Sequence, residues 1–363
     1  MNSRLAQAAL LSLSAAAALL GAEASLRLWF HAAPQLELDI YRKQDGLLLL
    51  RPNLERRHVT RQWDVGVRTN GEGWRDEERE GSGPTVLGLG DSFAFGWGVE
   101  AEEGFYSLAE QSIAESLINA GVPGTATIDQ ERLLEALIPR YRPRFVVLAF
   151  FVGNDFTETG FGGVERLDVV DGLLELKPLD GQEAPTSWGR RLARQSHLLQ
   201  LLRAVQYQLE GSAERGGHPR TWDAWMREFA QVHLRRPSPR AEEAMRLTLQ
   251  SLERIADRCS RGGIGLAVLV LPRSFQINEG ECDEMLTALG LTLEDLDMDK
   301  PQRVLREWAE GKDVLLVDLL DDFQARQASG ARLYYSPDAH LTPEGHAAAA
   351  EALAKALAAQ ANL

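Results

Sequence analysis

Three polar segments of this chain carry residue types that together can attack a carbonyl group. Ser92 lies in the segment GLGDSFAFG, Asn154 in VGND and His340 in SPDAHLTPEGH. A serine hydroxyl becomes a good nucleophile when a base removes its proton, and histidine suits that task because its pKa is near neutral. An asparagine amide can donate a hydrogen bond to the oxyanion that then forms. The three residues therefore indicate transfer of an acyl group to a serine.

Other groups that this chemistry requires are also present. Asp338 stands two residues before His340, where its carboxylate can hold the imidazole in the required tautomer. The backbone N–H of Ser92 and the side-chain amide of Asn154 are the expected oxyanion donors, and the backbone N–H of Gly124 is the candidate for a third.

Each segment also has a purely structural interpretation. Asp91 and Ser92 are common helix-capping residues, Asn-Asp is common in turns, and Thr342 followed by Pro343 is typical of a helix start. Together the segments favour catalysis, because they supply a nucleophile, a base and oxyanion donors at once.

The elements that must position these residues alternate along the chain. Apolar runs of strand length are followed by amphipathic stretches, which predicts an α/β fold with a parallel sheet. The expected strands are residues 85–89, 117–119, 145–151, 266–271 and 314–317, and the expected helices are 104–116, 130–138, 241–260 and 343–359. Pro139 and Pro143 are expected to break the chain before the third strand. Because ligands bind at the carboxyl ends of parallel strands, we expect the polar segments to meet there.

In order and position, the polar segments resemble the sequence blocks of the SGNH (GDSL-type) hydrolase superfamily. Gly90-Asp91-Ser92 is similar to its first block, Gly124 to its second, Asn154 to its third, and Asp338 with His340 to its last. The resemblance implies a three-layer α/β/α sandwich of flavodoxin-like topology, with about five parallel strands.

The resemblance also implies roles for individual residues. Ser92 would be the nucleophile, His340 the general base and Asp338 its orienting partner, with Gly124 and Asn154 as oxyanion donors. This chain departs from the usual blocks in two places. Gly153 directly precedes Asn154, where the superfamily has one residue between them, and Asp338 is two rather than three positions from His340.

Composition and motifs exclude several other classes of protein. Lys and Arg number 39 against 53 for Asp and Glu, and the net charge of −14 disfavours binding to nucleic acid. Ala94 stands where a Gly-x-Ser-x-Gly elbow needs glycine, and no dinucleotide or phosphate-loop motif follows the first strand. We expect neither a cofactor nor a metal. Cys259 and Cys282 could form one disulfide or remain two thiols.

The first thirty residues predict export from the cytoplasm. Arg4 precedes a run without charge from Ala6 to Ala22, which is near the lower end of the length that spans a bilayer. A cleaved signal peptide is the alternative, and an anchor is preferred because a polar pattern resumes at Glu23. The segment around Arg75 is also similar to a membrane-anchored bacterial branch of the superfamily. The catalytic domain would then lie outside the cytoplasm, in the periplasm or beyond.

We expect three parts in the chain. Residues 1–30 are the anchor or signal, residues 31–82 an extension that packs on the catalytic domain, and residues 83–363 the catalytic domain, with an insertion at about 156–240. Asn70 and Arg75 could line the site, or could pin the extension onto the sheet. His346 is expected to be structural or to contact a catalytic residue without being catalytic itself, and His58 and His233 are expected on the surface.

These observations predict a serine esterase that hydrolyses carboxylic esters through an acyl-serine intermediate. An O-acyltransferase that modifies an exported polysaccharide would use the same residues, and a binding protein that has kept the fold without activity is a third interpretation. The substrate could be a small ester, a saccharide ester or a lipid, because nothing in residues 156–240 selects among them.

Overall fold

The computed structural model describes residues 3–29, 34–35, 37–78, 85–176, 195–210, 227, 229–336 and 338–361. Much of the expected insertion, in residues 177–194 and 211–226, therefore lies outside the described residues.

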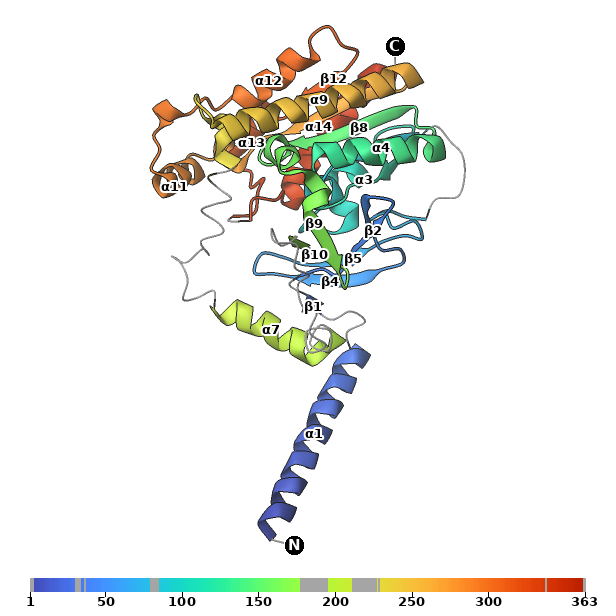
Figure 1. Cartoon of the computed structure of the whole chain (residues 1–363), viewed down its shortest axis with the longest axis vertical. Coiled ribbons are helices and arrows are strands. Elements are labelled where there is room, and N and C mark those ends of the chain that lie inside the picture. The colour runs from blue at the N-terminus through green and yellow to red at the C-terminus, as the bar shows by residue number, and fades with distance from the viewer. Residues whose placement is uncertain are drawn as a thin grey trace.

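Five parallel strands form the central sheet, in the order β12-β11-β8-β6-β7 (Figure 1). Their bounds are β6 (Thr85–Leu89), β7 (Ser116–Asn119), β8 (Phe145–Phe151), β11 (Gly265–Leu271) and β12 (Leu315–Asp318). Counted along the sheet this is the flavodoxin-like order, with a switch point between β6 and β8. The three-layer α/β/α fold is confirmed.

Helices cover both faces of this sheet, because its central strands are apolar along their whole length and must be buried on both sides. On one face, α4 (Thr127–Tyr141), α9 (Pro239–Gly262) and α12 (Lys300–Ala309) pack against alternate strand residues such as Leu87 and Val268. On the other face, α3 (Phe105–Glu110), α13 (Leu320–Ala328) and α14 (Pro343–Ala361) pack against the intervening residues, such as Val86 and Leu269.

Two expectations about helix ends were wrong. Pro139 lies inside α4, which continues to Tyr141 and ends where Arg142 adopts a left-handed conformation (φ 47°), directly before Pro143. Helix α3 stops at Glu110, well short of residue 116, because the chain must turn back to begin β7.

Further helical elements complete the domain, most of them one turn long: α2 (Ser92–Phe95), η1 (Ala101–Glu103), α5 (Asp155–Glu158), η2 (Thr159–Phe161), η3 (Gly163–Arg166), η4 (Gln231–His233), α10 (Ser274–Ile277), α11 (Glu279–Leu289) and η5 (Leu293–Asp295).

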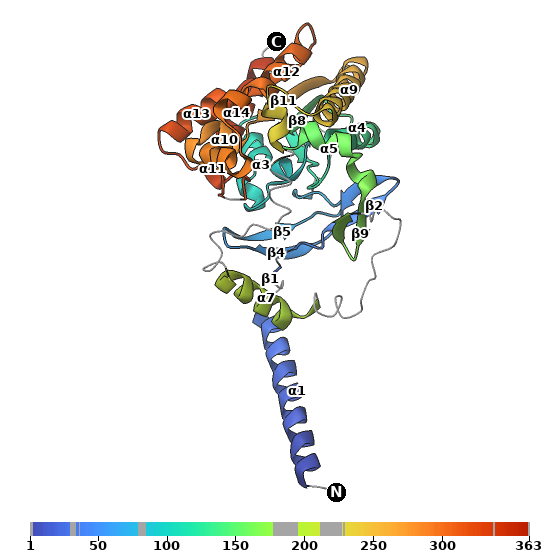
Figure 2. The ribbon, with the colours of Figure 1, turned by 60° about the vertical axis from the view of Figure 1, so that its left-hand side comes forward.

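Residues 34–68 form strands that the weak periodicity of their sequence did not predict. They are β1 (Pro34–Gln35), β2 (Tyr41–Gln44), β3 (Leu47–Leu50), β4 (Glu55–Val59) and β5 (Asp64–Arg68). Strands β2 and β3 form a hairpin, and β1, β4 and β5 form a three-stranded sheet, here called the small sheet. In β5 the buried Val65 and Val67 alternate with less buried residues, and Asp64 at its start pairs with Arg57 of β4. The small sheet lies between α1 and the central sheet (Figure 2).

A second hairpin and one helix belong to the part of the insertion that is described. Strands β9 (Leu167–Val170) and β10 (Leu173–Leu176) join through Asp171 and Gly172, both with positive φ, as a two-residue hairpin turn requires. Helix α7 (His197–Glu210) follows in the chain and contacts β1.

Helix α1 (Ser3–Trp29) extends away from the rest of the molecule (Figure 1). Within the described part of the chain it is the one helix long and apolar enough to cross a membrane, and none of its apolar stretch is buried by the protein. Cys259 and Cys282 are both free and buried, so the alternative of two thiols holds for this structure.

Candidate active site

A tight turn between β6 and α2 presents Ser92 at the carboxyl edge of the central sheet. Gly90 has a φ of 148°, and a Cβ there would lie 2.7 Å from the Ala94 Cβ and 3.0 Å from the Ala149 Cβ, so glycine is required. Asp91 caps α2, as predicted, because its Oδ1 accepts a hydrogen bond from the Phe93 backbone N–H at 2.9 Å. Ser92 is the first residue of α2 and is partly exposed between buried neighbours.

The histidine lies on a small loop before α14, and this loop is closed by its own backbone. The Tyr335 N–H donates to the His340 carbonyl at 2.8 Å, and the Ala339 N–H donates to the Tyr335 carbonyl at 2.7 Å. Ala339 has a φ of 67°, in the left-handed region that residues other than glycine rarely adopt. The backbone reversal at Ala339 lets the side chains of Asp338 and His340 meet across a spacing of only two residues.

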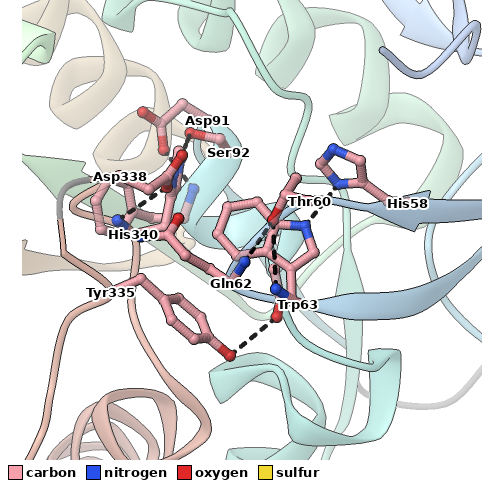
Figure 3. Close-up of polar contacts among 11 residues, drawn as sticks. His58, Thr60, Gln62, Trp63, Asp91, Ser92, Tyr335, Asp338 and His340 are labelled. Carbon is pink, nitrogen blue, oxygen red and sulfur yellow. Dashed lines mark hydrogen bonds and ion pairs between the residues drawn. The ribbon is translucent and has the colours of Figure 1, made fainter. Parts of the chain in front are cut away.

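Ser92, His340 and Asp338 form a continuous hydrogen-bonded chain, although the serine and the histidine are 248 residues apart in the sequence (Figure 3). The Ser92 Oγ lies 2.8 Å from the His340 Nε2, and the His340 Nδ1 is paired with the Asp338 Oδ1. With the carboxylate on Nδ1, that nitrogen carries the proton and Nε2 is free to accept the serine proton.

The pKa of Asp338 keeps this carboxylate ionised. Burial by itself would raise the pKa, but the electrostatic interaction with His340 and the hydrogen bonds from His340 outweigh it, so the pKa is lowered from 3.8. The side chains of His340 and Asp338 are 20% and 31% exposed, so the pair can be reached from solvent.

Asn154 lies beside the serine turn and is held there by a buried carboxylate. It precedes α5 at the end of β8, and its Nδ2 donates to the Asp91 Oδ2 at 3.0 Å and to the Glu158 Oε2 at 3.3 Å. The Asn154 Oδ1 is buried and has no hydrogen-bond partner among the described residues. Burial raises the pKa of Asp91, although the hydrogen bonds from Asn154 and Phe93 act in the opposite direction.

Gly124 is linked to this group only through its loop. Its loop reaches the serine turn through the Val122 N–H, which donates to the Gly90 carbonyl at 3.0 Å. Gly124 itself is exposed with a φ of 79°, and a Cβ there would lie 2.8 Å from the Leu174 side chain of β10. Among the described contacts, Gly124 makes no hydrogen bond with Ser92, Asn154 or His340.

The small sheet contributes aromatic residues around the histidine that the sequence did not indicate. His58 was expected on the surface, which was wrong: it is 2% exposed and accepts a hydrogen bond from the Trp63 Nε1 at 3.0 Å. The His58 ring lies 4.7 Å from the Trp97 ring, and that ring lies 6.2 Å from His340. Trp63 contacts Tyr335 of the histidine loop at 5.1 Å between ring centroids. The only signal in the sequence was the presence of a histidine and a tryptophan in an arginine-rich stretch.

Gln62, in the turn between β4 and β5, was also missed. Figure 3 shows its side chain reaching from the small sheet toward Ser92 and His340. The Gln62 Nε2 is buried and has no hydrogen-bond partner within the described part of the chain. An unsatisfied amide at this position is available to a polar atom of a substrate.

Arg75 and Asn70 have the structural role that was one of their two interpretations. The Arg75 side chain is 1% exposed and donates to the carbonyls of Val99 at 2.6 Å and of Gly66 at 2.9 Å, so it pins β5 to the loop after α2. The Asn70 Oδ1 accepts from the backbone N–H of Trp74 at 2.9 Å.

Two further histidines are buried and neutral. His346 has the structural role that was one of its two interpretations: its Nδ1 accepts from the Phe105 N–H at 3.2 Å, and burial lowers its pKa to about 3. His233 was expected on the surface and is instead fully buried, with a pKa lowered by burial to about 3. The residues that the structure describes contain no group of three or more His, Cys, Asp or Glu side chains arranged to hold a metal ion.

Comparison with known proteins assigns this chain to a family. The fold and the comparison define its class, a hydrolase of ester bonds built on a three-layer α/β/α sandwich. Residues 89–348 match the family model of the GDSL-like lipase/acylhydrolase family, and the chain belongs to that family. No curated protein matches the chain.

The solved structures that resemble this chain are distant from it in sequence. A member of the lipolytic G-D-S-L family from Veillonella parvula is 11% identical, with a TM-score of 0.38, over 75% of this chain and 97% of that one. The psychrotrophic esterase EstA from Pseudoalteromonas sp. is 14% identical, with a TM-score of 0.36, over 77% of this chain and 100% of that one. A two-domain esterase active on acetylated mannans is 13% identical, with a TM-score of 0.40, over 76% of this chain and 49% of that one.

Proposed function

We propose that this protein is a serine esterase that hydrolyses carboxylic esters through an acyl-serine intermediate. The observation that carries the proposal is the 2.8 Å contact between the Ser92 Oγ and the His340 Nε2, with Asp338 on the other imidazole nitrogen. Nucleophile, base and orienting carboxylate are thus already in hydrogen-bond reach of one another.

In the first half of the reaction, the Ser92 Oγ attacks the ester carbonyl carbon while His340 takes the serine proton. The carbonyl electron pair moves to oxygen, and the resulting oxyanion accepts hydrogen bonds from the Ser92 N–H, the Asn154 amide and the Gly124 N–H. The C–O bond to the alcohol then breaks as His340 gives its proton to the leaving oxygen. Ser92 is left as an acyl ester.

In the second half, a water molecule replaces the alcohol. The water oxygen attacks the acyl carbon while His340 takes a proton from the water. The second oxyanion accepts hydrogen bonds from the same donors as the first. Collapse of this intermediate breaks the bond to the Ser92 Oγ, which regains its proton from His340. The products are a carboxylic acid and the free enzyme.

Asn154 must present one N–H to the oxyanion in this mechanism. Its 3.0 Å bond to Asp91 holds the amide against the serine turn, so the longer contact of 3.3 Å to Glu158 is the one that a substrate oxyanion would replace. Because Asp91 is buried behind the turn, it can keep this hold throughout the reaction.

We also propose that α1 anchors the enzyme in a membrane, with the catalytic domain outside the cytoplasm. The support is the length and apolar composition of α1, together with its lack of burial. A fusion of alkaline phosphatase after residue 40 would be active in cells if the residues after the anchor are exported. An inactive fusion would contradict this topology.

The activity is tested with the full-length protein in detergent, using p-nitrophenyl acetate as substrate and a fluorophosphonate as a covalent probe of the serine. Hydrolysis and labelling are expected for the wild type, and both are lost in Ser92→Ala. Ser329→Ala, in an exposed turn away from the site, is the matched control and keeps full activity. Absence of serine-dependent hydrolysis and labelling in the wild type would discard the esterase proposal. Addition of saccharide acceptors tests transfer, because an acyl saccharide would then form in place of the free acid.

A further inference from the structure

The junction between α1 and α7 ties a surface helix to the end of the membrane anchor. The Glu23 carboxylate of α1 caps the start of α7: it accepts hydrogen bonds from the His197 N–H at 3.0 Å and from the Leu198 N–H at 2.9 Å. Arg27, one turn further along α1, donates to the Gln195 carbonyl at 2.6 Å. These bonds set both the position and the direction of α7 relative to α1.

The position of Glu23 sets the depth at which α7 begins. Residues 5–22 contain no charged side chain, and Glu23 is the first after them. A helix rises about 1.5 Å per residue, so this run is about 27 Å long, close to the roughly 30 Å of a bilayer's hydrocarbon core. If α1 spans the bilayer, Glu23 and the start of α7 therefore lie at the boundary between hydrocarbon and headgroups.

The exposed side of α7 carries apolar side chains at this level, together with the exposed polar side chains of Arg203 and Gln206. Leu199, Leu202 and Val205 are 44%, 54% and 46% exposed and follow one another at intervals of three residues. The other side is turned toward the protein: Gln200 is 7% exposed, and α7 contacts β1 of the small sheet. Figures 1 and 2 both show α7 running across the end of α1, with the small sheet on its far side from the anchor.

We propose that α7 is an interfacial helix, which lies in the membrane surface with Leu199, Leu202 and Val205 inserted among the lipids. An amphipathic helix held at the headgroup boundary buries its apolar side in this way. A bilayer is the occupant that the structure favours, because α7 begins at Glu23, where the uncharged run of α1 ends. The proposal rests on α1 spanning the membrane and is independent of the chemistry of Ser92.

A second membrane contact would determine how the enzyme sits on the membrane. A single spanning helix leaves the domain free to turn about the helix axis, whereas α1 and α7 together prevent this. The small sheet, which packs around the histidine loop, would then face the bilayer at a fixed height. The active site would be held close to the membrane surface, which favours esters carried by molecules at that surface.

The test is the depth of single labelled positions in the full-length protein, reconstituted in phosphatidylcholine vesicles. A cysteine is introduced by Leu202→Cys and labelled with an environment-sensitive nitrobenzoxadiazole dye. The native Cys259 and Cys282 are buried, and the wild type treated in the same way gives their background labelling. Leu13→Cys in the middle of α1 is the positive control. Leu293→Cys, 61% exposed in η5 of the α/β domain, is the matched control for an exposed leucine away from α1.

We expect the dye at position 202 to emit at shorter wavelength than the dye at position 293. It should be quenched by spin-labelled lipid and protected from aqueous iodide, while position 293 shows the opposite behaviour. Quenching by iodide at position 202, with lipid quenching at position 13, would overturn the proposal and leave the anchor intact. Protection from both quenchers would mean that a second copy of the chain covers α7, which also overturns it. Absence of lipid quenching at position 13 would refute both the anchor and the interfacial helix, and the esterase assay would be unaffected.

Discussion

The central sheet and the small sheet both reach the active site, but they supply different things. Strand ends of the central sheet carry Ser92 and Asn154, and the loop before α14 carries His340. The small sheet brings Gln62 and Trp63, neither of which can act as nucleophile or base. The candidate catalytic groups thus come from the parallel sheet, and the small sheet, whose strand pairs are parallel for β1–β4 and antiparallel for β4–β5, adds side chains beside them.

The two sheets also differ in how their positions are determined. The strands of the central sheet are buried on both faces, so the serine turn is fixed by the core of the domain. The turn at Gln62 is held by a few contacts, such as the Trp63–Tyr335 ring pair and the bond from the Trp63 Nε1 to His58. Substitutions in the first region should therefore reduce turnover, and substitutions in the second should change substrate affinity.

The largest expected effect is loss of turnover in the central region. Ser92→Ala and His340→Ala should each lower kcat for p-nitrophenyl acetate on the order of 10,000-fold or more, because each removes a group that acts in every step. The double variant should be no worse than either single one, since the pair acts as a unit. A double variant whose loss is the product of the two single losses would show that they act separately.

Asn154→Ala should lower kcat on the order of 100- to 1,000-fold, with little change in KM, because the amide is used mainly when the oxyanion has formed. Steady-state kinetics on a soluble ester measure both quantities. Asn278→Ala, which removes a helix cap at the start of α11, is the matched control and should leave kcat unchanged. A rise in KM alone would assign Asn154 to ground-state binding.

Gln62→Ala should raise KM up to about tenfold and leave kcat nearly unchanged. A change in KM of this size is expected for the loss of one neutral hydrogen bond to the substrate. The result would support different roles for the two sheets. The same assays measure it, with a series of esters of increasing size. Gln44→Ala, in the exposed part of β2, is the control. A fall in kcat as large as that of Asn154→Ala would place Gln62 among the oxyanion donors and remove the distinction between the two sheets.

The buried histidines His346 and His233 should make the protein lose stability in acid. The pKa of His346 is about 3 in the folded state and 6.5 when unperturbed, so the unfolded state binds more protons between these values. The free energy of unfolding should fall as the pH drops from about 6.5 toward 3. His346→Asn, which keeps an acceptor for the Phe105 N–H, should lose less stability over that range in urea titrations at several pH values. His233 remains in both proteins, so an equal slope in the two would contradict the assignment to His346.

The smallest expected effect concerns the strained backbone of the histidine loop. Ala339→Gly should change the free energy of unfolding by less than about 1 kcal/mol and keep full activity, because glycine adopts the left-handed conformation freely. Ala339→Val should destabilise the protein by about 1–2 kcal/mol. Urea unfolding and kcat check both variants. Equal stability of the glycine and valine variants would mean that the φ of this residue is not maintained in solution.

How far the sequence predicts the structure depends on which region is considered. Residues 85–89 and 145–151 were predicted as strands with the observed bounds, because strands buried on both faces are continuous apolar runs. Strands β4 and β5 were not predicted, because the one buried residue of β4 is the polar His58, and β5 is only five residues long with a glycine at its centre. His58 was misplaced because its burial comes from Trp63 and Trp97, and no local pattern reports such a contact.

The amino-acid sequence by itself determined the α/β class of this protein, the family to which it belongs and the residue types of its candidate nucleophile, base and oxyanion donor, because these depend on local runs and short motifs. Only the tertiary structure decided that the hydroxyl and the imidazole lie within hydrogen-bond distance, that Ala339 lets Asp338 reach across a shortened spacing, and that Trp63 of the small sheet lies against the histidine loop. Those properties arise from packing between segments far apart in the chain. The local pattern of apolar residues does not show which of these segments will pack together.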